Sequence, residues 1–118
     1  MFYRDIVYNY FYNSSNVGTI SNPTHTTMIG NYHGGSVVKL TAIVKNNIIE
    51  EIKFKVYGGV ALIACMSLLT DLIKNKSVEY AMSITSNQII ETLGLDSSKY
   101  VYAIMAIDSL KELISQTQ

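Results

Sequence analysis

The feature that most constrains this fold is a pair of alternating segments separated by two asparagines. Val37–Val44 is apolar at every second residue, and Ile48–Tyr57 alternates apolar with charged residues. A period of two is typical of strands that bury one face. The inward faces are expected to hold Val38, Leu40, Ala42 and Val44 in the first segment, and Ile48, Ile52, Phe54 and Val56 in the second. Because asparagine tolerates positive φ, Asn46-Asn47 predicts a tight hairpin turn.

Helical patterns flank this hairpin on both sides, with apolar residues recurring at spacings of three and four. Polar residues that can cap a helix N-terminus and glycines that can end a helix lie at their boundaries. The expected helices span Phe2–Asn13, Val60–Lys74, Ser77–Ser83, a segment from Thr85 or Ser86 to Leu93, and a last one that runs from Ser97 or Ser98 to Ser115, with one of these two serines as its cap. Asn16–Gly18 predicts a turn, and Thr19–Gly35 an extended strand or loop. The order predicts an α+β fold, with a small antiparallel sheet of about three strands and helices packed on one face.

Length and charge narrow the function classes. The 118 residues predict one domain over 1–118, and 48% apolar residues suffice for a core. Nine Lys and Arg balance nine Asp and Glu, so the formal net charge is zero. A nucleic-acid binder or a polybasic membrane-surface protein needs a basic excess, and neither partner is expected. The first residues do not read as a signal peptide, and no apolar run is long enough to span a bilayer, which predicts a cytoplasmic protein.

Chemically reactive residues are few. The chain has one cysteine, Cys65, which excludes an internal disulfide or a Cys-x-x-Cys pair. Cys65 lies on the apolar stripe of Val60–Lys74, so we expect it to pack in the core; an exposed thiol beside a cation would instead be a sulfur acceptor. His25, among threonines, is expected to be solvated. Ser36 has no base or oxyanion hole near it in sequence, and no enzymatic activity is expected.

Four motifs, in order, resemble the IscU/NifU N-terminal family of iron–sulfur cluster assembly scaffolds. They are Asn13–Gly18, Ile29–Leu40, Phe54–Ala64 and Leu95–Ser109. The similarity extends from Tyr3 to about Ile114. It implies an IscU-like fold in which a cluster, or zinc, is held by three cysteines with an Asp and a His.

The positions that the resemblance assigns to these ligands carry none of them. The cysteines align with Gly34, Gly59 and Tyr102, the Asp with Ser36, and the His with Val101. Thiolates are the ligands that iron–sulfur clusters need, and glycine, serine and valine cannot replace them. We therefore expect no bound metal or cofactor. The family's chaperone-recognition loop is changed as well, because Leu95–Lys99 lacks both family prolines.

The leading hypothesis is a scaffold-like protein that has lost its cluster ligands and serves as a non-catalytic binding or regulatory partner of the assembly machinery. The resemblance makes a cysteine desulfurase or an intact scaffold the candidate partner. The alternative is a small-molecule-binding protein that reuses the vacated pocket, lined by His33, Gly34, Gly59 and Tyr102.

Overall fold

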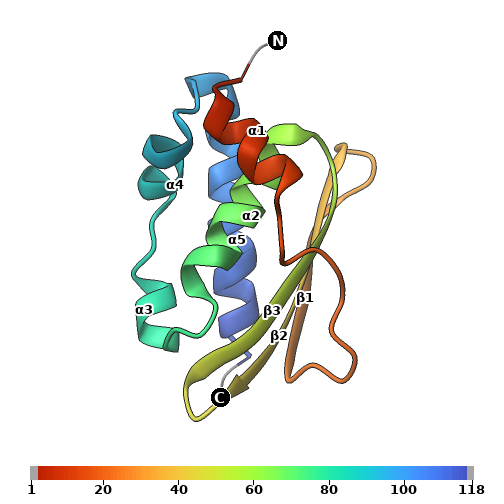
Figure 1. The fold of residues 1–118 in the computed structure, drawn as a ribbon. Helices are drawn as coiled ribbons and strands as arrows, with labels where there is room; N and C mark the ends of the chain where they lie inside the picture. The colour runs from red at the N-terminus through yellow and green to blue at the C-terminus, as the bar shows by residue number, and fades with distance from the viewer. Residues whose placement is uncertain (1–2, 117–118) are drawn as a thin grey trace.

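The computed structural model describes residues 3–116, within which helices cover one face of a three-stranded antiparallel sheet (Figure 1). The elements, in order, are α1 (Asp5–Tyr12), β1 (His25–Asn31), β2 (Ser36–Lys45), β3 (Ile48–Tyr57), α2 (Val60–Ile73), α3 (Val78–Met82), α4 (Ser86–Leu93), a 3-10 turn (Ser97–Lys99) and α5 (Tyr100–Ile114). The strands lie in the order β1-β2-β3. The predicted α+β architecture is confirmed. Phe2, at the start of the first predicted helix, lies outside the described residues.

The β2–β3 hairpin forms where the alternation predicts it. Asn46 and Asn47 both adopt positive φ, 51° and 67°, as a tight turn requires. Across the hairpin Leu40 faces Phe54, and both side chains are buried under the helices. The opposite face of the sheet carries the lysines of both strands. The hairpin therefore separates an apolar inner face from a charged outer face.

The expected inward position of Ile48 is wrong. Ile48 is exposed, and its neighbour Ile49 is fully buried. The pairing register shifts between Ile43 and Val44. Ile43 is paired with Glu51 but Val44 with Ile49, so Glu50 has no partner on β2. A bulge of one residue reverses the alternation on its far side, so Ile49 turns toward the core.

Helix α2 forms the centre of the core. Its side chains are buried on nearly all sides from Ala61 to Ile73, since α1, α5 and β3 all pack against it. The shorter helices begin and end at the predicted residues. Ser77 caps α3, Thr85 and Gln88 form a reciprocal capping box on α4, and Gly94 ends α4 in the left-handed region at φ 65°.

The segment between α1 and β1 is more ordered than the predicted turn and loop. The carbonyl of Asn16 accepts a hydrogen bond from Phe54 N, and Gly18 N donates to the carbonyl of Phe54, so the segment pairs with the edge of β3. Farther along, the backbone N–H of Ile20 donates to Thr41 Oγ1 at 3.1 Å. This segment therefore covers part of the outer face of the sheet.

Two further sequence expectations are wrong. His25 is buried rather than solvated, because β1 places it opposite Ala42 on the inner face, where its Nδ1 lies 2.7 Å from Thr24 Oγ1. The final helical region is capped by Asp96 rather than by Ser97 or Ser98, since the Asp96 carboxylate accepts from Ser98 N. Within residues 3–116, no helix is both long and apolar enough to cross a membrane.

Candidate functional site

The five positions aligned with cluster ligands fall in three segments of the chain. Gly34 is in the β1–β2 turn and Ser36 begins β2; Gly59 caps α2, and Val101 and Tyr102 lie in the first turn of α5. Two close approaches join the segments. A Cβ atom built on Gly58 would lie 3.7 Å from Ser36 Oγ, and one built on Gly30 would lie 2.7 Å from Met105 Cε of α5.

The chemistry at these positions does not fit an iron–sulfur cluster. The glycines offer no donor atom, and the Val101 side chain is apolar and 58% exposed. The donors that remain are the Ser36 hydroxyl and the Tyr102 phenol, neither of which is a soft thiolate. Within residues 3–116, no three His, Cys, Asp or Glu side chains gather closely enough to hold a metal ion.

Lack of room does not explain the missing ligand at Gly59. Its backbone is extended, with φ −93°, and an added Cβ would meet no heavy atom within 4 Å. Gly34 is more confined, because its N–H donates to Asn31 Oδ1 at 2.5 Å and an added Cβ would lie 3.2 Å from the same oxygen. A side chain at Gly59 would therefore be tolerated without rearrangement, whereas one at Gly34 would displace Asn31.

Tyr102, at the third cysteine position, has a packing role in this fold. Its side chain is half-buried, and Lys99 Nζ lies 5.8 Å from the centre of its ring. The same ammonium lies 5.8 Å from the ring of Tyr3, which precedes α1. A cation between two aromatic rings attracts both. Tyr102 thus helps join the start of α5 to the N-terminal segment, a contact that a cysteine there would not make.

His33, the remaining member of the predicted pocket, lies exposed in the β1–β2 turn. Beside it, the ring of Tyr32 packs edge-to-face on Tyr57 of β3, with centroids 5.1 Å apart. These two tyrosines are 64% and 56% exposed. This end of the sheet therefore carries a pair of exposed aromatic side chains.

Cys65 is inert in the folded chain. The thiol is fully buried in α2 among core side chains, which confirms the predicted core packing. Burial disfavours the thiolate and raises the pKa of Cys65 to about 12. Because the thiolate is the form that accepts sulfur, the native protein holds no reactive cysteine among its described residues.

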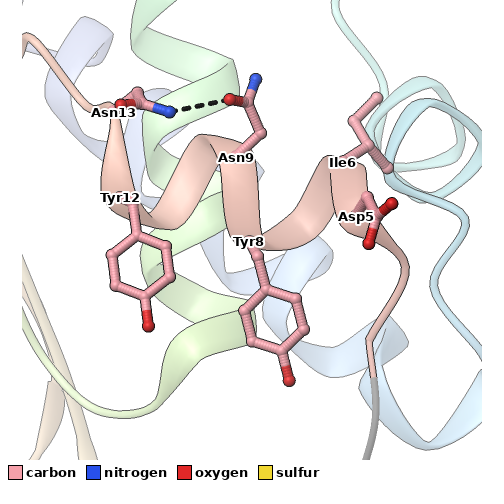
Figure 2. Close-up of a pocket in the computed structure, with 6 residues that line it drawn as sticks. All are labelled: Asp5, Ile6, Tyr8, Asn9, Tyr12 and Asn13. Atoms are coloured by element: carbon pink, nitrogen blue, oxygen red, sulfur yellow. Dashed lines mark hydrogen bonds between the residues drawn. The ribbon is translucent and has the colours of Figure 1, made fainter.

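The structure also shows a shallow groove of about 580 Å³ along α1 (Figure 2). It is lined by Asp5, Ile6, Tyr8, Asn9, Tyr12 and Asn13. Tyr8 and Tyr12 project to the same side of the helix with their rings stacked at 6.5 Å, while Asn13 donates to Asn9 Oδ1 at 2.7 Å. Its phenols, amides and single carboxylate form no nucleophile–base pair. None of the four residues of the predicted pocket lines it.

Sequence reasoning did not identify this groove, although a signal existed. Tyr8 and Tyr12 fall outside the apolar stripe of Tyr3, Ile6, Val7 and Tyr10 and are four residues apart, so they share the outer side of the helix. Large aromatic residues on the exposed side of a short helix are the pattern that would have indicated it.

Comparison with known proteins places these features in context. The sequence profile of the family described as "NifU-like N terminal domain" matches residues 2–118. The chain is 36% identical over 113 residues to the iron-sulfur cluster assembly scaffold protein IscU 1 of Archaeoglobus fulgidus, covering 95% of this chain and 74% of that protein. It is 35% identical over 119 residues to the scaffold protein IscU of Escherichia coli, covering 98% and 93%.

Solved structures agree on the fold. The chain superposes with a TM-score of 0.83 on a crystal structure from Fervidobacterium islandicum of a protein assigned as an iron–sulfur cluster assembly scaffold for the SUF system. That match covers 95% of this chain and 96% of the other, at 17% identity. A NifU-like protein from Brucella abortus matches with a TM-score of 0.76 at 12% identity, covering 96% and 92%. At these identities the match shows the fold alone.

Proposed function

This chain belongs to the family of NifU-like N-terminal domains, and on that premise we propose that it is a scaffold-shaped protein without cluster chemistry. It acts in the cytoplasm as a non-catalytic binding or regulatory partner of iron–sulfur cluster assembly. The resemblance seen in the sequence is confirmed by the family match. Its curated relatives are iron–sulfur cluster assembly scaffolds by description.

The observation that carries this proposal is the combination of a retained fold with an absent donor set. None of the five aligned positions holds a thiolate, carboxylate or imidazole. The one cysteine is buried and its pKa is raised to about 12. A scaffold must accept sulfur on a thiolate before it can build a cluster. This chain therefore supports neither sulfur acceptance nor cluster binding by the family's chemistry.

The retained surface is what a partner would recognise. A cysteine desulfurase or an intact scaffold are the candidates, because each would meet the family's overall shape without needing its ligands. Lys99 supports this interpretation, because its ammonium lies beside the rings of both Tyr102 and Tyr3 and joins the start of α5 to the N-terminal segment without a cluster.

A small-molecule binder that reuses the ligand corner is the second candidate. The room beside Gly59 favours it, because a Cβ there would meet nothing within 4 Å. The groove that the structure shows lies along α1 instead. We therefore place the partner function first.

The test is a sulfur-transfer and binding experiment with a purified cysteine desulfurase and cysteine. We expect the desulfurase to be retained on the immobilised chain. Mass spectrometry should find no added sulfur on the chain, whereas an intact IscU in the same reaction should gain sulfur. Sulfur on the native wild-type chain would contradict the loss of acceptor chemistry. Retention of neither the desulfurase nor an intact scaffold would contradict the partner role.

A further inference from the structure

The outer face of the sheet carries lysines at directly opposed positions. Lys39 of β2 is paired with Lys55 of β3, and the next row pairs Thr41 with Lys53. Residues opposed in this way lie on the same face. Since Leu40 and Phe54, between these rows, are buried under the helices, the three lysines point to the solvent side.

Exposed apolar side chains border these lysines. The register places Met28 of β1 beside Lys39, and Tyr57 two residues beyond Lys55. Met28 is 63% exposed, and Tyr57 packs edge-to-face with Tyr32. We call these residues the outer-face patch: Met28, Tyr32, Lys39, Lys53, Lys55 and Tyr57. The loop after α1 covers part of the adjoining row, where Ile20 N donates to Thr41 Oγ1 and Gly18 lies against the stem of Lys53. Lys39 and Lys53 are therefore half-buried, whereas Met28, Tyr32, Lys55 and Tyr57 are exposed.

Little negative charge on the sheet balances the patch. β3 carries two exposed acids, Glu51 on the outer face beyond Lys53 and Glu50 at the bulge. The chain as a whole is neutral, with nine acidic and nine basic residues. Most of its acids lie outside the sheet: Asp5, Asp71, Glu79, Glu91, Asp96, Asp108 and Glu112. The neutral total therefore conceals a local basic surface.

Folding gives no reason for placing Lys39 opposite Lys55. Like charges directly opposite each other in a sheet are destabilising, and a carboxylate in place of either Lys39 or Lys55 would turn a repulsion into an attraction. The long stem of Lys53 is accommodated by Gly18, where an added Cβ would lie 3.4 Å from Lys53 Cδ. A surface that costs stability and is edged by exposed aromatic rings is suited to binding.

We propose that the outer-face patch docks an acidic segment of a partner protein. In an extended segment, alternate residues are about 6.8 Å apart. Glutamates at every second position would therefore match the spacing of Lys53 and Lys55 along β3. An apolar side chain of the segment would cover Met28 or Tyr57. This inference goes beyond the proposed function and holds whether or not the chain binds a cluster.

A nucleic acid fits this surface less well. The patch has no arginine, and the sequence pI is about 6.7, well below that of domains that bind phosphate backbones.

The experiment measures fluorescence anisotropy of a labelled peptide that alternates glutamate with phenylalanine, at low salt. We expect the wild-type chain to bind it, and added salt to weaken the binding because the contacts are solvent-exposed charges. The double variant K39E/K55E should bind at least about tenfold more weakly. The matched control K74E/K111E makes the same change in net charge at two exposed lysines outside the sheet, and should bind like the wild type.

Thermal unfolding separates binding from folding. K39E alone replaces the repulsive pair with an attractive one, so its Tm should rise by about 1–4 °C while its affinity for the peptide falls. K39E/K55E restores a like-charge pair and should melt near the wild-type Tm. Absence of binding by the wild type, equal loss in K74E/K111E, or tighter binding of a thymidine oligonucleotide of equal charge would each overturn the proposal.

Discussion

Replacing Leu69 with alanine tests whether apolar packing alone holds this fold. Leu69, in α2, is fully buried in the hydrophobic core and has no solvent-accessible surface. Truncation to alanine removes three carbons, and at about 0.8 kcal/mol for each buried methylene the lost transfer free energy is about 2.4 kcal/mol. A cavity that does not collapse raises the cost to about 4 kcal/mol. For a chain of this size, Tm should fall by about 10 °C or more.

The assay is urea unfolding followed by circular dichroism, with Leu72→Ala as the matched control. Leu72 is on the same helix but only half-buried, so its truncation should cost less than half as much. A metal chelator should leave the free energy of unfolding of the wild type unchanged, because no cluster of metal-ligating side chains contributes to folding within residues 3–116. A cost below about 1 kcal/mol for Leu69→Ala, or a large chelator effect, would refute the reasoning.

Three further predictions concern single residues. N-ethylmaleimide at pH 8 should leave native Cys65 unmodified and label it in urea, because burial raises its pKa to about 12; rapid labelling of the native chain would contradict the buried site. The pKa of Cys65 in the folded chain lies above its ordinary value of 9.0, so the thiol's contribution to stability is complete below pH 9 and is lost as pH rises toward 12. Cys65→Ala should therefore flatten the alkaline fall in the free energy of unfolding. An unchanged slope would argue against the raised pKa. Gly94→Ala should lower stability by about 1–2 kcal/mol in urea unfolding, because Gly94 has φ 65° and a Cβ there would lie 2.5 Å from Arg4 Cδ; a neutral effect would contradict a strained left-handed backbone at this position.

Local chemistry made much of this fold predictable. The two asparagines of the hairpin, the capping box of α4 and the glycine at its end are each determined by a few neighbouring residues. The sequence predictions that were wrong depend on pairing between residues that are distant in the chain. Nothing local to Ile48 or Ile49 reveals the bulge that exchanges them, and nothing beside His25 in the sequence shows that β1 will bury it opposite Ala42.

For the candidate site as well, the sequence indicated features of local motifs but not contacts between distant residues. The resemblance assigns the cluster ligands to five positions, and the sequence shows that none of these positions carries a thiol; the assignment itself stays a prediction. The aligned motifs could not show that Lys99 lies between Tyr3 and Tyr102, since this contact joins the two ends of the chain. The opposition of Lys39 and Lys55 likewise depends on the register of the hairpin, which the alternation of each strand alone does not fix.

The most direct test of the central claim is anaerobic reconstitution with ferrous iron and sulfide, followed by analysis of iron and acid-labile sulfide. The wild-type chain should carry no stoichiometric cluster. The variant G34C/G59C/Y102C, which returns thiols to the three aligned positions, should gain one if it keeps the fold by circular dichroism. A stoichiometric cluster on the wild type would contradict the claim that this chain keeps the family's architecture without its metal chemistry.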